Sequence, residues 1–195
     1  MQIRYEEKRE DRYFTYADYC TWDDDRRWEL IDGTAYLMAS PAPIHQKALL
    51  NLGSKFQAHL KGKKCQVYVE LDVRLNKDKG DDTVVRPDIL VVCDPDKIGK
   101  TSINGTPDFI IEILSPSTRK HDMTTKFIKY REAAVKELWH VDPDSQTVTV
   151  YTWSDGVYIA DNYGPTDKIT VGILPELTID MADIFETESE EKENI

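Results

Sequence analysis

Two acidic residues stand among apolar residues in segments that have the character of β-strands. Asp88 comes directly before the apolar run 89–92, and Glu112 lies inside the apolar run 109–114. A carboxylate in such a place is costly unless it is paired or bound to a metal. If the two strands are neighbours, the two acids converge and repel each other, and a hard divalent cation relieves that repulsion. All-oxygen ligands favour Mg²⁺ or Mn²⁺ over Zn²⁺.

Each acid also has a purely structural interpretation. Asp88 can form an Asx-type turn or a salt bridge at the start of its strand, and Glu112 can form a buried ion pair with Arg86 or Lys126. We favour the functional interpretation because the two acids occur in register. A glutamate in the middle of the run 109–114 is also hard to explain by structure alone.

A third charged group follows in the next segment, which has the pattern of a helix. Asp122, Lys126 and Lys129 lie on adjacent turns there. A lysine at position 126 can orient an attacking hydroxide and offset the charge of a phosphate. The alternative is an exposed helical lysine paired with Asp122 at i, i+4.

Three further residues form a second group of candidates. His45 opens a predicted helix one turn before Leu49, so we expect it to face inward. Glu29 in a predicted hairpin and Glu70 in a predicted strand can reach the same cleft. We rank all three below the pair Asp88 and Glu112, since histidines at helix starts and acids on strand surfaces commonly have structural roles.

Hydrophobic patterning predicts the elements that position these residues. It predicts a short helix from Thr15 through Trp22, a hairpin of 28–31 and 34–38, a helix over 44–60, and a half-buried strand over 67–74. Two buried strands follow at 89–92 and 109–114, and then a helix to about Ala134 with Met123, Phe127 and Tyr130 on its inner face. Strands are expected at 137–141, 147–153 and 157–160, and the stretch 173–185 is expected to close the sheet.

These elements indicate an α/β (α+β) fold in which helices flank a mixed central sheet. We expect one domain over 1–195, with a core of about 15–185 and flexible ends at 1–13 and 186–195. The net charge of −11 argues against broad, non-specific binding of nucleic acid. Three scattered cysteines make a complete disulfide framework unexpected and favour a reducing, cytosolic setting. No apolar run approaches the ~18 residues of a membrane span.

The motifs together resemble the PD-(D/E)XK nuclease superfamily, and within it the Uma-two family of restriction-endonuclease-like proteins. The resemblance covers roughly residues 15 to 185. It is carried by the segments 28–33 (WELIDG), 40–45 (SPAPIH), 85–91 (VRPDILV), 107–118 (PDFIIEILSPST) and 137–143 (ELWHVDP).

The resemblance implies a role for individual residues. Asp88, Glu112 and the backbone carbonyl of Ile113 would be ligands of Mg²⁺ or Mn²⁺, and DNA would be the substrate. The superfamily pattern places a lysine two residues after the second acid, but this chain has Leu114 there. Related proteins carry that lysine on the next helix, a placement that Lys126 matches.

Three hypotheses follow for the function. The first is a metal-dependent DNA endonuclease built on Asp88, Glu112 and Lys126. The second is a non-catalytic module for assembly or nucleic-acid binding, which the acidic composition favours. It would include a homodimer through the late hairpin with Trp153, Tyr158 and Tyr163. The third is a hydrolase of a small phosphorylated substrate, which a deep and narrow pocket would favour.

Overall fold

A computed structural model describes residues 12–23 and 25–185. Its main sheet has six strands in the order β11-β10-β9-β8-β6-β3. Only β8 and β9 run parallel, and the other neighbours are antiparallel. The sheet consists of β3 (Gln66–Val69), β6 (Ile89–Val92), β8 (Phe109–Ile113), β9 (Glu137–Asp142), β10 (Thr147–Ser154) and β11 (Val157–Tyr163).

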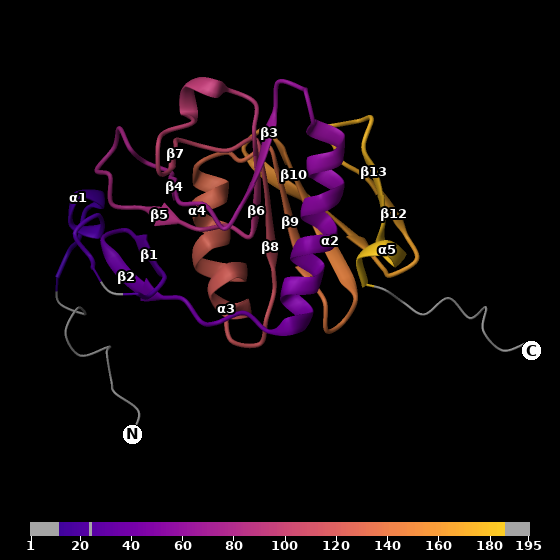
Figure 1. Cartoon of the computed structure of the whole chain (residues 1–195), viewed down its shortest axis with the longest axis horizontal. Helices are drawn as coiled ribbons and strands as arrows, with labels where there is room; N and C mark the ends of the chain where they lie inside the picture. Colours follow the sequence, from indigo (N-terminus) through magenta and orange to yellow (C-terminus); the bar gives the residue numbers. More distant parts are fainter. Residues whose placement is uncertain (1–11, 24, 186–195) are drawn as a thin grey trace, which may run out of the picture.

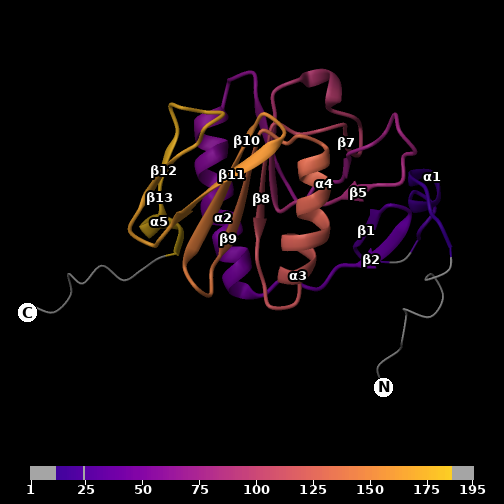
Figure 2. The ribbon, with the colours of Figure 1, turned by 180° about the vertical axis from the view of Figure 1, so that it is seen from behind.

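Helices cover both faces of this sheet, and the two opposite views show α2 on one face and α4 on the other (Figures 1 and 2). The mixed α/β architecture expected from the sequence is confirmed. The helices are α1 (Tyr16–Tyr19), α2 (Pro43–Leu60), the 3₁₀ turn η2 (Pro95–Lys97), α3 (Arg119–His121), the π-helical turn η3 (Asp122–Lys126), α4 (Phe127–Glu132) and α5 (Met181–Phe185).

The period of two in the central strands divides the core into two parts. Ile89 and Ile111 pack on the side of α2, whereas Leu90 and Ile110 pack on the side of α4. Asp88 is two residues from Leu90, and Glu112 is two residues from Ile110, so each acid lies on the same face as that neighbour. The strand period therefore directs both acids toward the face that α4 covers.

A second sheet stands beside the main one in Figure 1, at the end where the chain begins. Its five short strands have the order β2-β1-β5-β4-β7. The predicted hairpin is present, and its turn residues Asp32 and Gly33 have positive φ angles of 49° and 75°, as a two-residue hairpin turn requires. The strands are β1 (Trp28–Ile31), β2 (Thr34–Leu37), β4 (Val73–Arg74), β5 (Val84–Val85) and β7 (Ile103–Asn104).

Two predicted elements differ in the structure. The strand predicted over 67–74 ends at Val69, because Glu70 turns the chain with a φ of 47°, and β4 then joins the second sheet. The stretch 173–185 does not close the main sheet. It forms β13 (Thr178–Asp180), which pairs only with β12 (Lys168–Thr170), and the helix α5, which packs near α2.

The late hairpin β10–β11 is present, but its aromatic side chains do not form an exposed face. Tyr158 packs against Phe127 and Tyr151, and its hydroxyl donates to the carbonyl of Val135 at 2.9 Å. The exposed apolar side chains of β11 are instead Val157 and Ile159. A homodimer through this hairpin stays a prediction.

Two of the three cysteines are paired. Cys65 directly precedes β3 and Cys93 directly follows β6, so the antiparallel pairing of these strands brings the two together, where they form a disulfide; Cys20 is free. The pairing was not anticipated, and a reducing compartment stays a prediction. No helix within the described ranges is long and apolar enough to cross a membrane. The expected flexibility of 1–11 and 186–195 lies outside the described residues, and the single domain stays a prediction.

Candidate active site

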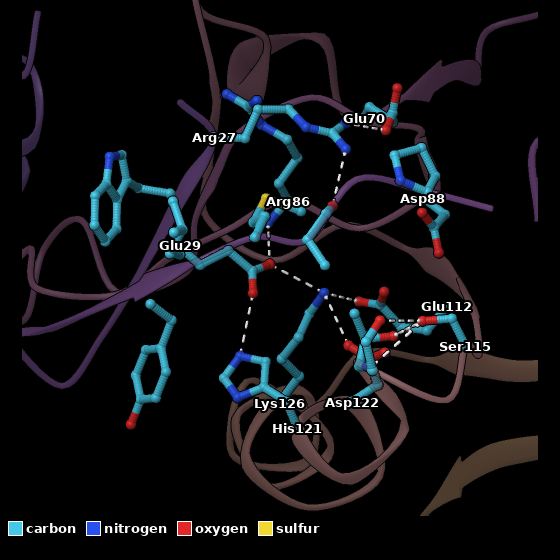
Figure 3. Close-up of a pocket in the computed structure, with 18 of the residues that line it drawn as sticks. Arg27, Glu29, Glu70, Arg86, Asp88, Glu112, Ser115, His121, Asp122 and Lys126 are labelled. Atoms are coloured by element: carbon cyan, nitrogen blue, oxygen red, sulfur yellow. Dashed lines mark hydrogen bonds and ion pairs between the residues drawn. The ribbon is translucent and has the colours of Figure 1, made fainter. Parts of the chain in front are cut away.

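A cavity of about 1050 Å³ lies where the hairpin β1–β2, the start of α2 and the turn η3 meet one end of β6 and β8. Figure 3 shows its charged side chains pointing toward one another. Every site residue predicted from the sequence lines it. These residues are Glu29, His45, Glu70, Asp88, Glu112, Ile113, Asp122 and Lys126.

Asp88 is fixed at the start of β6 by two contacts. Antiparallel pairing of Ile89 with Ile111 sets Asp88 beside Glu112 in the register of β6 and β8. The Asp88 Oδ2 atom accepts a hydrogen bond from the backbone N–H of Ile113 at 2.6 Å, and Oδ1 lies 3.1 Å from Nε2 of His45. The two strands are therefore neighbours, which is the condition under which the sequence predicted that Asp88 and Glu112 converge.

His45 faces inward, as its position in the helix predicts. It is 8% exposed, and its Nδ1 atom has no hydrogen-bond partner among the described residues. Burial lowers the pKa of His45, but the hydrogen bond and negative charge of Asp88 outweigh burial and leave the pKa above its usual value. A positive charge on His45 would therefore stand directly behind Asp88.

Glu112 is only 2% exposed, and its Oε1 atom has two partners. Lys126 Nζ lies 2.7 Å away, and the hydroxyl of Tyr130 donates a short hydrogen bond to the same oxygen. Burial raises the pKa of Glu112 well above its usual value. Lys126 opposes that rise, while the charges of Asp122 and Asp88 add to it. An additional cation beside this carboxylate would stabilise its ionised form and so lower its pKa.

Lys126 lies at the centre of the cluster in Figure 3, with its amino group among three carboxylates. Its Nζ atom is 2.7 Å from Glu112, 3.0 Å from Glu29 and 3.5 Å from Asp122. It is 2% exposed, so the alternative of an exposed helical lysine is wrong, although the pairing with Asp122 is present. Burial opposes its charge, but Glu112 and Glu29 prevail and raise the pKa of Lys126.

The π-helical turn explains how one helix supplies three groups to this place. Asp122, Lys126 and Tyr130 are four residues apart, and in a regular α-helix such a row drifts by roughly 80° over eight residues. The wider π turn over Asp122–Lys126 winds more slowly and reduces this drift. The same change of phase leaves Met123 43% exposed, so its predicted inward position is wrong.

Glu29 lies closer to the centre of the cluster than its low rank among the candidate residues predicted. Its Oε1 atom accepts from the backbone N–H of Arg86 at 2.8 Å, and Oε2 lies 3.2 Å from Nε2 of His121. Burial raises the pKa of Glu29, but Lys126, His121 and the Arg86 amide together lower it to about 2. Glu29 is therefore a buried, ionised partner of Lys126.

The other two acids differ from each other. Glu70 forms a short ion pair with Arg27 on the cavity wall, away from the Lys126 cluster. Asp122 is 5% exposed, and burial raises its pKa even though Lys126 opposes the shift. Asp122 thus belongs to the cluster around Lys126, whereas Glu70 stands apart from it.

The residues of the cavity and its cluster that were not predicted as site residues include Arg27, Arg86, His121 and Tyr130. Arg27 pairs with Glu70, and the Arg86 side chain pairs with Asp72 at 2.7 Å. His121 contacts Glu29, and Tyr130 contacts Glu112. For Arg86 and His121 the sequence carried a signal, because they adjoin Pro87-Asp88 and Asp122. Tyr130 was predicted to be a core residue. It is buried in the core, and its hydroxyl also donates a hydrogen bond to Glu112.

The side chains of the cavity wall differ in how well they fit a divalent cation. Within residues 12–23 and 25–185, no group of three or more His, Cys, Asp or Glu side chains stands ready-made around one metal position. The chemistry of the wall nevertheless fits a hard cation, since oxygen donors dominate it. Five carboxylates face three cationic side chains along the wall: Glu29, Glu70, Asp88, Glu112 and Asp122 against Arg27, Arg86 and Lys126.

Known proteins share both the sequence pattern and the fold. The pattern of the family Uma2, described as “Putative restriction endonuclease”, matches residues 15–182. An uncharacterised protein of Synechocystis, slr1290, is 27% identical over an alignment of 157 residues, and the match covers 78% of this chain and 81% of that protein. A crystal structure from Anabaena variabilis, titled “a putative nuclease belonging to DUF820”, has a TM-score of 0.73 at 22% identity and covers 89% of this chain and 98% of that one. The chain therefore belongs to the Uma2 family.

Proposed function

We propose that this protein is a metal-dependent endonuclease that hydrolyses phosphodiester bonds of DNA. The observation that carries the proposal is the meeting of Asp88 and Glu112 from adjacent strands, with the amino group of Lys126 2.7 Å from Glu112. The family and the fold support a nuclease, and the excess of carboxylates in the cavity supports the use of a divalent cation.

Asp88, Glu112 and the backbone carbonyl of Ile113 are the groups that would hold Mg²⁺ or Mn²⁺. When bound, such an ion lowers the pKa of a coordinated water and polarises a phosphate. Asp88 is already oriented by the Ile113 amide and by His45, so its position does not depend on the ion. Glu112 is held by Tyr130 and Lys126 through one oxygen, Oε1.

In this proposal Lys126 takes the role that the superfamily pattern gives to a lysine two residues after the second acid. Leu114, which stands at that position, is buried and 4% exposed. The amino group of Lys126 supplies positive charge beside Glu112, where it can offset charge that develops on a phosphate. Glu29 holds this lysine from the other side, which keeps the amino group in place when Glu112 changes partners.

A non-catalytic module on the same fold is the second candidate. Two observations favour it: the three carboxylates that engage Lys126, and the absence, in the described part of the chain, of a preformed group of three metal ligands. The hydrolase of a small phosphorylated substrate is a third possibility. It differs from the proposal only in the size of the substrate.

A cleavage assay separates these functions. Linear, supercoiled and single-stranded DNA are incubated with the protein in Mg²⁺, Mn²⁺ or EDTA. We expect products only with a metal, and a loss of at least 100-fold in rate for Asp88→Asn, Glu112→Gln and Lys126→Met. Asp108→Asn is the control, because this carboxylate near the start of β8 pairs with Lys136 outside the cavity. Equal cleavage by wild type and the double variant at Asp88 and Glu112 would refute the proposal.

A further inference from the structure

One wall of the cavity is apolar and open. It consists of β2 and the residues that follow it, where Tyr36 is 36% exposed and Leu37 is 52% exposed. The two side chains point to opposite faces of the hairpin, and Tyr36 is the one on the face that carries Glu29. A cation and one phosphate need only a small part of about 1050 Å³, and cavities of this size hold larger ligands.

Tyr36 is fixed close to the charged cluster. It stands directly opposite Glu29 in the register of β1 and β2, so its side chain shares the face of the hairpin that carries Glu29. Its ring lies 4.7 Å from the ring of His121 at an interplanar angle of 40°. His121 in turn contacts Glu29 at 3.2 Å, which ties the two rings to the acid cluster.

The backbone after β2 is held in place as well. The N–H of Met38 donates to the carbonyl of Arg27 at 2.9 Å, and the guanidinium of Arg27 donates to the carbonyl of Ala39 at 3.4 Å. The apolar wall is therefore preorganised on the hairpin, and a ligand that stacks on Tyr36 has little ordering cost to overcome.

A ligand that uses both walls must carry a planar, apolar group next to a phosphate. A nucleotide has this composition, and aromatic side chains stack on the faces of bases without regard to sequence. In a regular duplex the base faces are already stacked on one another. We propose that Tyr36, supported by His121, is a stacking platform for an unpaired nucleobase, which makes single-stranded or locally opened DNA the substrate class of this cavity. This inference rests on the proposed function, since the acid pair would act on the phosphate of the same strand.

The test compares two fluorescent 12-mers: oligo-dT and an oligomer of the same length in which every base is missing. Binding is measured by anisotropy in Ca²⁺ with wild type as background, and a gel checks that the oligomers stay intact. We expect Tyr36→Ala to weaken binding of oligo-dT about tenfold and to leave the abasic oligomer unchanged, while Tyr36→Phe keeps the preference. Leu50→Ala is the control, because this α2 side chain is 71% exposed outside the cavity.

Three results would overturn the inference. The first is that Tyr36→Ala binds oligo-dT as tightly as its background does. The second is that neither oligomer binds, and the third is that binding of both weakens together in Tyr36→Ala while thermal melting shows a folded protein. Failure of the nuclease proposal gives a different result. Wild type then cuts no DNA in Mg²⁺ or Mn²⁺, whether or not it binds oligo-dT more tightly than the abasic oligomer.

Discussion

Lys126 and Glu112 form an ion pair that is costly to bury. Both are buried to 2% exposure, and removing charged groups from water costs several kcal/mol for each ion. Burial raises the pKa of Glu112 well above its usual value, so its ionised form is held at a cost. Stability sacrificed at one place in a fold is a common property of active sites.

The two residues should therefore respond differently to neutral substitution. Glu112→Gln keeps the shape and removes a disfavoured charge, so we expect the free energy of unfolding to stay equal or rise. Lys126→Met leaves Glu29 buried without its main cation, so we expect a loss of about 3–5 kcal/mol. Urea denaturation measures the free energy of unfolding of both variants. Lys129→Met is the control: Lys129 pairs with the exposed residues Asp32 and Glu132, so its loss should change stability by less than about 1 kcal/mol. Similar losses for Glu112→Gln and Lys126→Met would contradict this account.

His140 gives the fold a dependence on pH. It is 3% exposed, and neither ring nitrogen has a hydrogen-bond partner among the described residues. Burial, with a contribution from Lys126, lowers the pKa of His140 to about 4, against about 6.5 in the unfolded chain. Between these values the unfolded state binds more protons, so stability falls as the pH drops from 6.5 toward 4.

The expected loss from His140 is up to about 3 kcal/mol across this window. His140→Leu removes the titrating group, so its free energy of unfolding should depend less on pH between 6.5 and 4 than that of wild type. Denaturation at several pH values checks this. An unchanged slope in the variant would show that other groups produce the dependence.

At the scale of elements, the site depends on how short segments are joined. The antiparallel pairing of β6 and β8 places Asp88 beside Glu112, the hairpin β1–β2 brings Glu29, and η3 brings Asp122 and Lys126. π turns of this kind recur at functional sites, because they change the direction of side chains within a helix.

At the scale of the whole molecule, local patterns predicted more than long-range ones. Periodicity located the hairpin at Asp32-Gly33, the helix α2 and the buried strands around 90 and 110, and the acids in these strands predicted the site. The end of β3 at Glu70 and the π turn at Asp122–Lys126 depend on tertiary contacts, so no local signal revealed them. The central position of Glu29 likewise depends on the packing of a hairpin that is distant in sequence from Lys126.

Binding of Mn²⁺ by isothermal calorimetry tests the central claim, that Asp88 and Glu112 form a cation site, most directly. Wild type should release or absorb heat with one ion per chain, Asp88→Asn and Glu112→Gln should lose this signal while remaining folded, and Asp108→Asn should keep it. Binding that survives in both Asp88→Asn and Glu112→Gln would contradict the claim and place the ion elsewhere.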